Sequence, residues 1–551
     1  MSVTVKASCT VRPMEATWCG RLALSELDQT GNIGQVSFVY FYHLPQNCLS
    51  QYNTIASTLK DSLSRVLVPF YPLAGRLHWT NNGRLELDCN DTGVPFIEAE
   101  SSSTVQHLSH FSSSSEYHYL VPIVDYYSLP IHELPLLVVQ LTKFKCGGIC
   151  VGITVSHAVV DGSSTFHFIR EWARFARGES LHTVPFLDRK VLRAGEPPLV
   201  PLTKCHVLEK LNDPPLLLGR TDNREEKEKK TTMAFLKISK TQIETLQKRA
   251  NESSPKPIND GGYSRYESVT GHIWRCASKA RKHKENQPTE LNVTVDSRGR
   301  MKPPLPKAYF GNAILDSVTC CLAGDLVSEP LGYTASRIRE AIERVSDEYV
   351  RSEIEFLKNQ KNLRRFHRDF HEEGREREPF YGNPNLSVVS WLRLPIYGID
   401  FGWGKEVRMS SATHDFDGDF VLLPDPDEDG SVLVCMGLQV LHIDAFKKHF
   451  YQDIQAWHVA APKIPFIGNL HQLGVLSHRS FQALSHKHGP LMLLQLEQVP
   501  TLIVSSADVA EEIFKTHNLV FMNRPKTTAA GIFLYGYKDV AFTPYGDEWR
   551  H

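Results

Sequence analysis

A histidine placed directly after an apolar run is the most chemically suggestive feature of the sequence. The segment His157-Ala-Val-Val-Asp161 follows residues 147–156, which are mostly apolar and β-branched, as is typical of a buried strand. An imidazole can accept a proton near neutral pH because its ordinary pKa is about 6.5. An aspartate-glycine turn follows, and we expect Ser163 or Ser164 to cap the next helix. The pattern predicts a general base at a strand-to-helix junction; a structural histidine beside a turn aspartate is the alternative.

Two further segments combine charge with turn residues. In Asp400-Phe-Gly-Trp-Gly404, the glycines permit the positive φ values of a tight turn. The segment is not a dinucleotide fingerprint, because Val407 stands where the third glycine should be and no βαβ unit surrounds it. In the second segment, Arg298 and Arg300 flank a glycine and could bind an anion or pair with a buried aspartate.

The elements that must position these residues follow from periodicity and residue type. Apolar residues recur with helical spacing around both sides of the histidine motif, and β-branched or aromatic runs indicate strands between them. We predict helices over 55–67, 163–179, 242–251 and 335–345, and strands over 38–42, 147–156, 386–392 and 431–440.

Composition and charge exclude several classes of protein. With 61 basic against 62 acidic residues, the chain lacks the excess positive charge and the basic-aromatic pattern of a nucleic-acid-binding protein. The N-terminus lacks a signal-peptide pattern and no apolar run is long enough to span a bilayer. We therefore expect a cytoplasmic protein that does not bind membranes, with its eleven cysteines reduced.

No metal site is predicted. Cys146 and Cys150 lack the partner residues that would complete a zinc site. The acidic run 425–430 begins like an EF-hand loop, but Met436 occupies the position of the bidentate glutamate. We interpret this run as a loop between two strands.

The residue composition changes at two places along the chain. A proline-rich stretch and the charge run Arg224–Lys230 suggest a solvated crossover between two halves, and a linker-like segment follows Ile454. We predict an N-terminal domain over 1–200, a crossover loop over 201–232, a C-terminal domain over 233–454 and a separate segment over 455–551.

Taken in this order, the three motifs resemble those of the BAHD acyltransferases, plant enzymes that transfer acyl groups from coenzyme A thioesters. The resemblance extends over residues 1–454 and includes Phe70–Arg76, His272–Arg275 and Gln439–Ile454. It implies an α/β fold with the two-domain, chloramphenicol-acetyltransferase-like architecture of mixed sheets and helices. It also implies a monomer that uses the thioester as a co-substrate and holds no tightly bound cofactor.

The resemblance assigns roles to the motif residues. His157 would be the base that removes a proton from the acceptor, which attacks the thioester directly, while Asp161 turns away and pairs with Arg298. The site residues it implies are catalytic His157, Asp161 and Asp400; structural Phe401, Gly402, Trp403, Gly404 and Arg298; coenzyme-A-binding Ser264 and Arg300; and acceptor-pocket residues Ser390, Trp391 and Arg393.

Within the family, the sequences of residues 384–406 and of Thr413–Asp419 look most like those of the spermidine hydroxycinnamoyl transferases. Such an enzyme would also need carboxylates to bind the amine, and the sequence does not identify them. The alternative is transfer to a hydroxyl of shikimate or quinate. The enzymes of that type usually carry threonine where Val389 stands, which counts against a polyol acceptor.

The C-terminal segment resembles the beginning of a plant cytochrome P-450. The resemblance rests on Pro462–Asn469, His486–Pro490 and Pro544–Arg550. That family binds haem through a cysteine thiolate, and no cysteine follows Cys435. We therefore expect no haem, which disfavours a haem monooxygenase, and we interpret the chain as a fusion of two reading frames or a truncated gene.

Overall fold

The computed structural model describes most of the first 455 residues and part of the remainder. The described residues are 2–30, 35–44, 52–109, 111–122, 124, 129–193, 229–257, 261–361, 363, 382–412, 416–426, 429–455, 469–474, 476–488, 491–496, 499–507, 510 and 513. They fall into two compact units, residues 1–450 and 451–551. The predicted crossover lies outside the described residues up to position 228, and strand β9 begins within its predicted bounds at Thr231.

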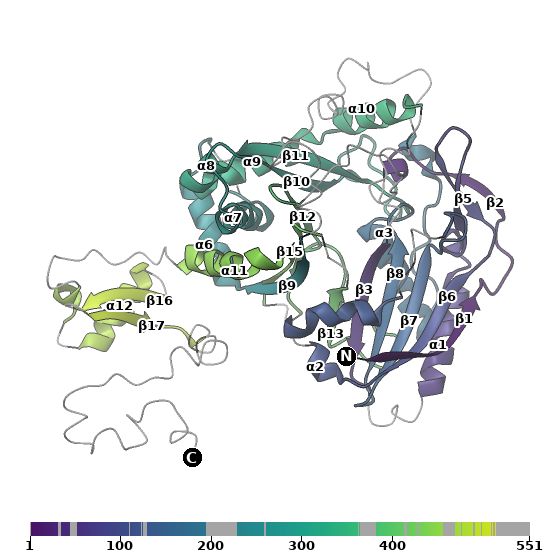
Figure 1. Cartoon of the computed structure of the whole chain (residues 1–551), viewed down its shortest axis with the longest axis horizontal. Helices are drawn as coiled ribbons and strands as arrows, with labels where there is room; N and C mark the ends of the chain where they lie inside the picture. The colour runs from purple at the N-terminus through teal and green to yellow at the C-terminus, as the bar shows by residue number, and fades with distance from the viewer. Residues whose placement is uncertain are drawn as a thin grey trace. The chain divides into compact units, whose positions relative to one another are not determined.

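Two six-stranded sheets organise the first unit, and a three-stranded sheet accompanies them. In Figure 1, β3, β8, β7, β6 and β1 lie side by side, as in the strand order of the first sheet. The first sheet contains, in order, β1 (Val3–Val11), β6 (Val94–Ser101), β7 (Leu137–Phe144), β8 (Ile149–Ser156), β3 (Gln35–Tyr42) and β13 (Arg408–Ser411). The second contains β11 (Ile314–Leu322), β10 (Pro288–Asp296), β12 (Leu386–Ser390), β14 (Asp419–Pro424), β15 (Val432–Gln439) and β9 (Thr231–Ile238). The small sheet contains β2 (Gly20–Ala23), β5 (Leu85–Cys89) and β4 (Arg76–Trp79).

The helices of the first unit pack around these sheets. The α-helices are α1 (Tyr52–Val66), α2 (Val105–Ser109), α3 (Gly162–Ala176), α6 (Lys240–Glu252), α7 (Arg265–Ala280), α8 (Ala323–Ser328), α9 (Leu331–Arg344), α10 (Asp347–Lys358) and α11 (Val440–Gln455). Short 3₁₀ helices include η1 (Asp28–Thr30), η3 (Tyr71–Ala74), η4 (Phe111–Leu120) and η5 (Arg189–Leu192). The predicted mixed α/β class and the eight predicted helices and strands are confirmed, with ends displaced by a few residues.

Both sheets mix parallel and antiparallel pairing. In the first sheet β6 and β7 are parallel and the other neighbours are antiparallel. In the second, β12 is parallel to both β10 and β14. Strand β13 comes from the second half of the chain but pairs with β3 of the first half, so the sheets do not follow the predicted division at residues 201–232.

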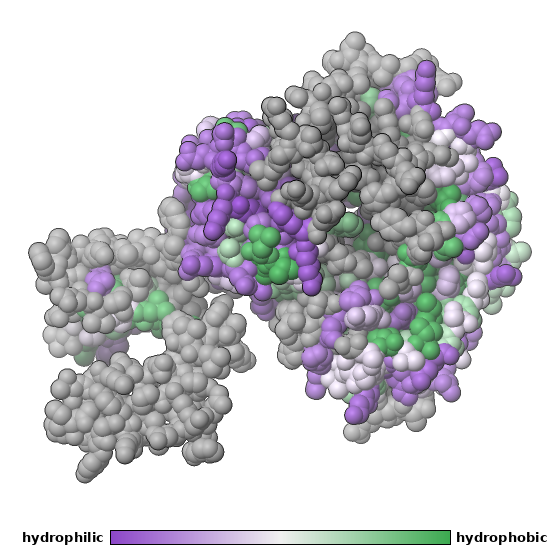
Figure 2. All heavy atoms as spheres, viewed as in Figure 1, coloured by the Kyte–Doolittle hydropathy of each residue, from purple (hydrophilic) through white to green (hydrophobic). Residues whose placement is uncertain are grey.

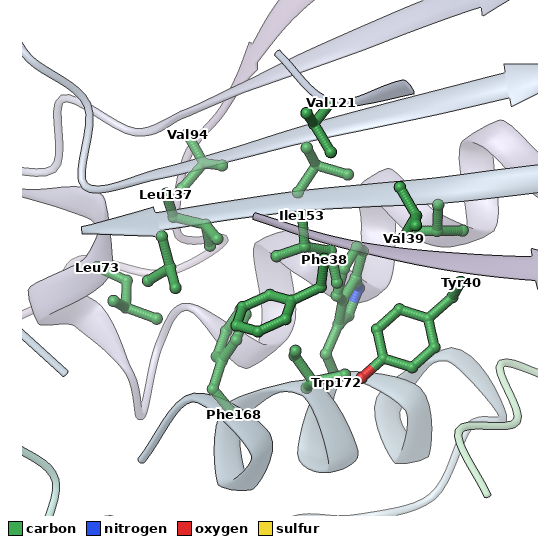
Figure 3. Packing of buried hydrophobic residues seen from close by; sticks show 14 of the residues in the cluster. Phe38, Val39, Tyr40, Leu73, Val94, Val121, Leu137, Ile153, Phe168 and Trp172 are labelled. Carbon is green, nitrogen blue, oxygen red and sulfur yellow. The ribbon is translucent and has the colours of Figure 1, made fainter. Parts of the chain in front are cut away.

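Strand β8, which leads to the histidine motif, runs through the interior of the first unit. All eight of its residues are buried. Figure 3 shows Trp172 and Phe168 of α3 projecting toward Phe38 and Ile153 of the sheet. At Gly152, an added Cβ would lie 2.0 Å from the Leu120 carbonyl oxygen, so only glycine fits there. This packing fixes the end of β8 firmly.

In Figure 2, hydrophobic residues of the first unit gather in a small patch over α11 and again over the first sheet, among polar residues. Val440 and Leu441 are exposed at the start of that helix. Among the described residues, no helix combines the length and the apolar character that a membrane span requires.

The second unit, described separately, contains η8 (Leu470–Gln472), α12 (Ser477–His488), β16 (Leu491–Leu496) and β17 (Val499–Val504). The two strands form an antiparallel hairpin. Two of the three motifs that carried the P-450 resemblance, Pro462–Asn469 and Pro544–Arg550, lie almost wholly outside the described residues, and the third is described only as far as His488.

Candidate active site

His157 is the first residue after β8, and a short turn connects it to α3. Its side chain is half-buried. Asp161, rather than Ser163 or Ser164, is the N-cap of α3, because its carboxylate accepts the Ser164 backbone N–H at 3.0 Å. The expected serine cap is therefore wrong, while the predicted strand-to-helix junction is confirmed.

Asp161 turns into the protein and pairs with Arg298. The guanidinium makes a bidentate contact, with Nη1 donating to Oδ2 at 2.7 Å and Nη2 donating to Oδ1 at 2.9 Å. The Ala313 backbone N–H also donates to Oδ2. Burial opposes ionisation, but Arg298 and the two amide donors, from Ser164 and Ala313, outweigh it and hold the pKa of Asp161 below its ordinary value.

The geometry separates the two motif residues by role. Asp161 is committed to Arg298 and to backbone amides, so it is placed to hold the turn rather than to exchange protons with His157. Among the described residues, none forms a hydrogen bond with the His157 ring.

The sequence reasoning did not assign a role to the residue that holds the His157 backbone. Asn312 Nδ2 donates to the His157 carbonyl oxygen at 2.8 Å, and the Asn312 amide groups also donate to Asp28, which is fully buried. Asn312 closes the Tyr309–Asn312 segment that follows the arginine motif. Its proximity to that motif is the one sequence signal that points toward it.

The two arginines of the second motif have different surroundings. Arg298 contacts Asp161, whereas Arg300 Nη1 donates to the carbonyl oxygens of Ile342 and Val345 at 2.8 and 2.9 Å, at the C-terminal end of α9. This contact occupies one nitrogen of Arg300 in joining the loop to α9. Coenzyme A binding by Arg300 stays a prediction.

The loop Asp400–Gly404 is held together by the aspartate itself. Asp400 Oδ1 accepts the backbone N–H groups of Gly402 and Gly404 at 2.7 and 3.0 Å, and both glycines have positive φ. The guanidinium of Arg177, the C-cap of α3, donates to the Asp400 carbonyl oxygen. These contacts favour a role for Asp400 in shaping the loop over a role in proton transfer.

Aromatic packing attaches the same loop to the first half of the chain. Phe401 meets Trp172 of α3 edge-on with ring centroids 4.9 Å apart, and Trp403 meets Tyr42 of β3 edge-on at 6.1 Å. Phe401 is fully buried. The loop therefore packs against β3 and against α3, the helix that follows the histidine turn.

Ser264 is exposed and caps α7. Its hydroxyl accepts the Glu267 backbone N–H, and its own N–H donates to the Glu267 carboxylate, which Arg339 binds through two nitrogens. An exposed, rigid helix N-terminus suits an anionic group. The predicted contact of Ser264 with coenzyme A is compatible with this position and stays a prediction.

The three candidates for the acceptor pocket differ in environment. Ser390 ends β12 and is half-buried, Trp391 is 8% exposed, and Arg393 is exposed. Trp391 packs against Phe38 and Phe166, with ring centroids 5.3 and 5.8 Å apart. Trp391, from the second half of the chain, is therefore part of the aromatic core around β3 and α3. In the described part of the chain, no group of three or more potential metal ligands comes together.

The described residues form a mixed α/β fold with a histidine at the junction of a buried strand and a helix. The Transferase family matches residues 1–453, and the cytochrome P-450 family matches residues 460–551. The chain therefore belongs to the Transferase family, which is the BAHD family of acyltransferases, and it is an acyltransferase with an additional P-450-like segment.

Curated relatives cover the same region. The chain is 44% identical to a hydroxycinnamoyl-CoA:piscidic acid hydroxycinnamoyltransferase of Actaea racemosa and 38% identical to a shikimate O-hydroxycinnamoyltransferase of Nicotiana tabacum, each over 82% of this chain and 100% of the relative. It is 35% identical to a hydroxycinnamoyl-CoA:5-hydroxyanthranilate N-hydroxycinnamoyltransferase of Avena sativa, over 81% of this chain and 99% of the relative. The structure of vinorine synthase matches with a TM-score of 0.60 and 23% identity, covering 81% of this chain and 96% of that one, and supports the predicted fold.

Proposed function

We propose that the protein transfers a hydroxycinnamoyl group from coenzyme A to a spermidine-type amine, with His157 as the general base. The observation that carries the catalytic part is the turn itself: a half-buried histidine directly follows a buried strand, while Asp161 pairs with Arg298. The hydroxycinnamoyl donor is supported by the names of relatives that align over their whole length.

The mechanism needs one proton acceptor and no covalent enzyme intermediate. The neutral acceptor nitrogen attacks the thioester carbonyl, a C–N bond forms, and a His157 ring nitrogen takes the proton. The C–S bond then breaks, and the imidazolium returns the proton to the departing thiolate, which leaves as free coenzyme A. Because spermidine nitrogens are mostly protonated near neutral pH, the amine must also lose a proton to the solvent before it attacks.

Three observations support the amine acceptor. Residues 384–406 resemble the spermidine enzymes in wording, and Val389 offers no hydroxyl to a polyol. The Avena sativa relative is named as an N-hydroxycinnamoyltransferase, so a nitrogen acceptor occurs among the relatives.

Transfer to the hydroxyl of a hydroxy acid is the second candidate. The specific observation in its favour is that the Actaea racemosa and Nicotiana tabacum relatives are named for piscidic acid and shikimate. Arg393, which is exposed after β12, is a residue that could pair with such an acid.

A parallel acceptor assay separates the two candidates. The full chain is given feruloyl-CoA with spermidine, shikimate or piscidic acid, and thiol release and product mass are measured. We expect an alkali-resistant amide with spermidine and a much lower rate with either acid. An alkali-labile ester formed preferentially from an acid would overturn the amine proposal, and no transfer to any of the three acceptors would overturn both.

A further inference from the structure

A pair of oppositely charged side chains lies buried beneath the histidine turn. Arg189 of η5 and Asp28 of η1 approach to 2.7 Å between Nη1 and Oδ1, and their side chains are 1% and 0% exposed. The backbone N–H and the hydroxyl of Ser25 both donate to the other carboxylate oxygen of Asp28, Oδ2. The pair is distinct from the one formed by Asp161 and Arg298, with which it shares no atom.

Both ends of this pair reach the backbone of the turn. Arg189 Nη2 donates to the Val159 carbonyl oxygen at 2.9 Å. On the other side, Asn312 donates to Asp28 Oδ1 through its backbone N–H at 2.9 Å and its side-chain amide at 3.1 Å. The same amide donates to the His157 carbonyl oxygen at 2.8 Å. Two carbonyls of the turn, at positions 157 and 159, are therefore tied to a single buried carboxylate.

Stability alone does not account for burying these charges. Removing two ions from water is unfavourable, and well-packed apolar residues of similar volume often serve a core as well or better. What an apolar replacement cannot supply is a set of directed hydrogen bonds to two chosen carbonyl groups. Fixing these carbonyls fixes the 157–158 and 159–160 peptide planes, and the first of these adjoins the Cα that carries the His157 side chain.

We propose that Asp28, Arg189 and Asn312 are positioning residues that orient the His157 imidazole for proton transfer. The proposal rests on the proposed role of His157 as the general base. Arg298 holds the Asp161 end of the turn. Asp28, Arg189 and Asn312 hold the other end, which carries His157. A base displaced by about 1 Å can lose on the order of a hundredfold in rate.

The first test compares two buried arginines. Arg189→Met is expected to lower kcat about a hundredfold, with KM for feruloyl-CoA changed less than about twofold. Arg281→Met is the matched control, because Arg281 and Asp417 form a similar pair at 2.9 Å with side chains 1% and 4% exposed. Among the described residues, that pair contacts none of the turn 157–161, so its loss should reduce stability while the folded protein keeps its kcat.

A second variant and a double-mutant cycle remove the remaining ambiguity. Asn312→Leu frees the His157 carbonyl without breaking the Asp28–Arg189 pair, and it should also lower kcat more than KM. In a His157→Ala background, Arg189→Met should cause no further loss, because the residue acts through the imidazole. An equal loss in both backgrounds, or unchanged kcat in both Arg189→Met and Asn312→Leu, would overturn the inference.

The outcomes also separate this inference from the proposed function. If His157→Ala keeps full turnover, the general-base assignment fails first. If His157→Ala loses turnover while Arg189→Met and Asn312→Leu retain it, only the positioning role fails. If Arg189→Met does not fold, the Asn312→Leu result decides, because that variant keeps both buried charges paired.

Discussion

Replacing Arg298 by methionine should lower the free energy of unfolding, because it leaves the buried carboxylate of the histidine motif without its cationic partner. The substitution leaves Asp161, whose side chain is 1% exposed, without its bidentate partner. Breaking a buried ion pair by removing one member typically costs about 3–5 kcal/mol. The amide donors of Ser164 and Ala313 remain, so we expect a loss near the lower end, at about 3 kcal/mol.

The loss should depend on pH in a defined direction. In the wild-type protein the pKa of Asp161 is held below its ordinary value of 3.8, so the pair stabilises the fold above that pH and loses its effect as the pH falls through the lowered pKa. Without Arg298, burial dominates and raises the pKa of Asp161. The variant then gains stability relative to the wild type as acid protonates Asp161, and the difference between them narrows.

Urea unfolding followed by tryptophan fluorescence measures this difference at several pH values between about 7.5 and 4.5. Arg300→Met is the control, because it removes hydrogen bonds to two carbonyl groups without leaving a buried carboxylate, at a cost of about 1–2 kcal/mol that should not vary with pH. Asp161→Asn combined with Arg298→Met removes the buried charge and keeps an acceptor for the Ser164 and Ala313 amides, so it should recover much of the loss. Equal costs for Arg298→Met and Arg300→Met, or a cost that grows in acid, would refute the reasoning.

Three further predictions concern the other motifs. Asp400→Ala removes the acceptor of two loop amides and should cost about 1–3 kcal/mol in urea unfolding, while Asp400→Asn, which keeps the acceptor, should stay near wild type; similar losses would contradict this. Ser264→Ala should cost about 1 kcal/mol as a lost helix cap, and a rise in KM for feruloyl-CoA greater than that of Glu267→Gln would support coenzyme contact. Val389→Thr should raise the ratio of shikimate to spermidine turnover; an unchanged ratio would remove Val389 from the specificity argument.

The sequence predicted those parts of the site whose signal is local. The buried strand before His157 and the helix after it are visible as a run of β-branched residues followed by a helical apolar stripe, and the structure has them as β8 and α3. The pairing of Asp161 with Arg298 across 137 residues was implied by family resemblance alone, because nothing in the spacing connects the two positions.

The missed features depend on contacts between distant segments. Asp28 and Asn312 are 284 residues apart. The residues around each of them are those of an ordinary turn, so neither segment indicates that the two meet. Arg189 stands between Asp188 and Lys190, and a short run of charged residues usually indicates solvated side chains. Strand β13 is only four residues long and half serine, so no alternating pattern indicates that it joins the first sheet.

Acceptor-dependent release of coenzyme A by His157→Ala is the most direct test of the account. With feruloyl-CoA and the preferred acceptor, thiol release by the wild-type protein should depend on acceptor concentration, and the variant should be slower by about 10² to 10⁴ fold, the range expected when a general base is removed. The folded state of the variant is checked by its urea midpoint. A correctly folded His157→Ala protein that releases thiol within about twofold of the wild-type rate would contradict the assignment of the general base.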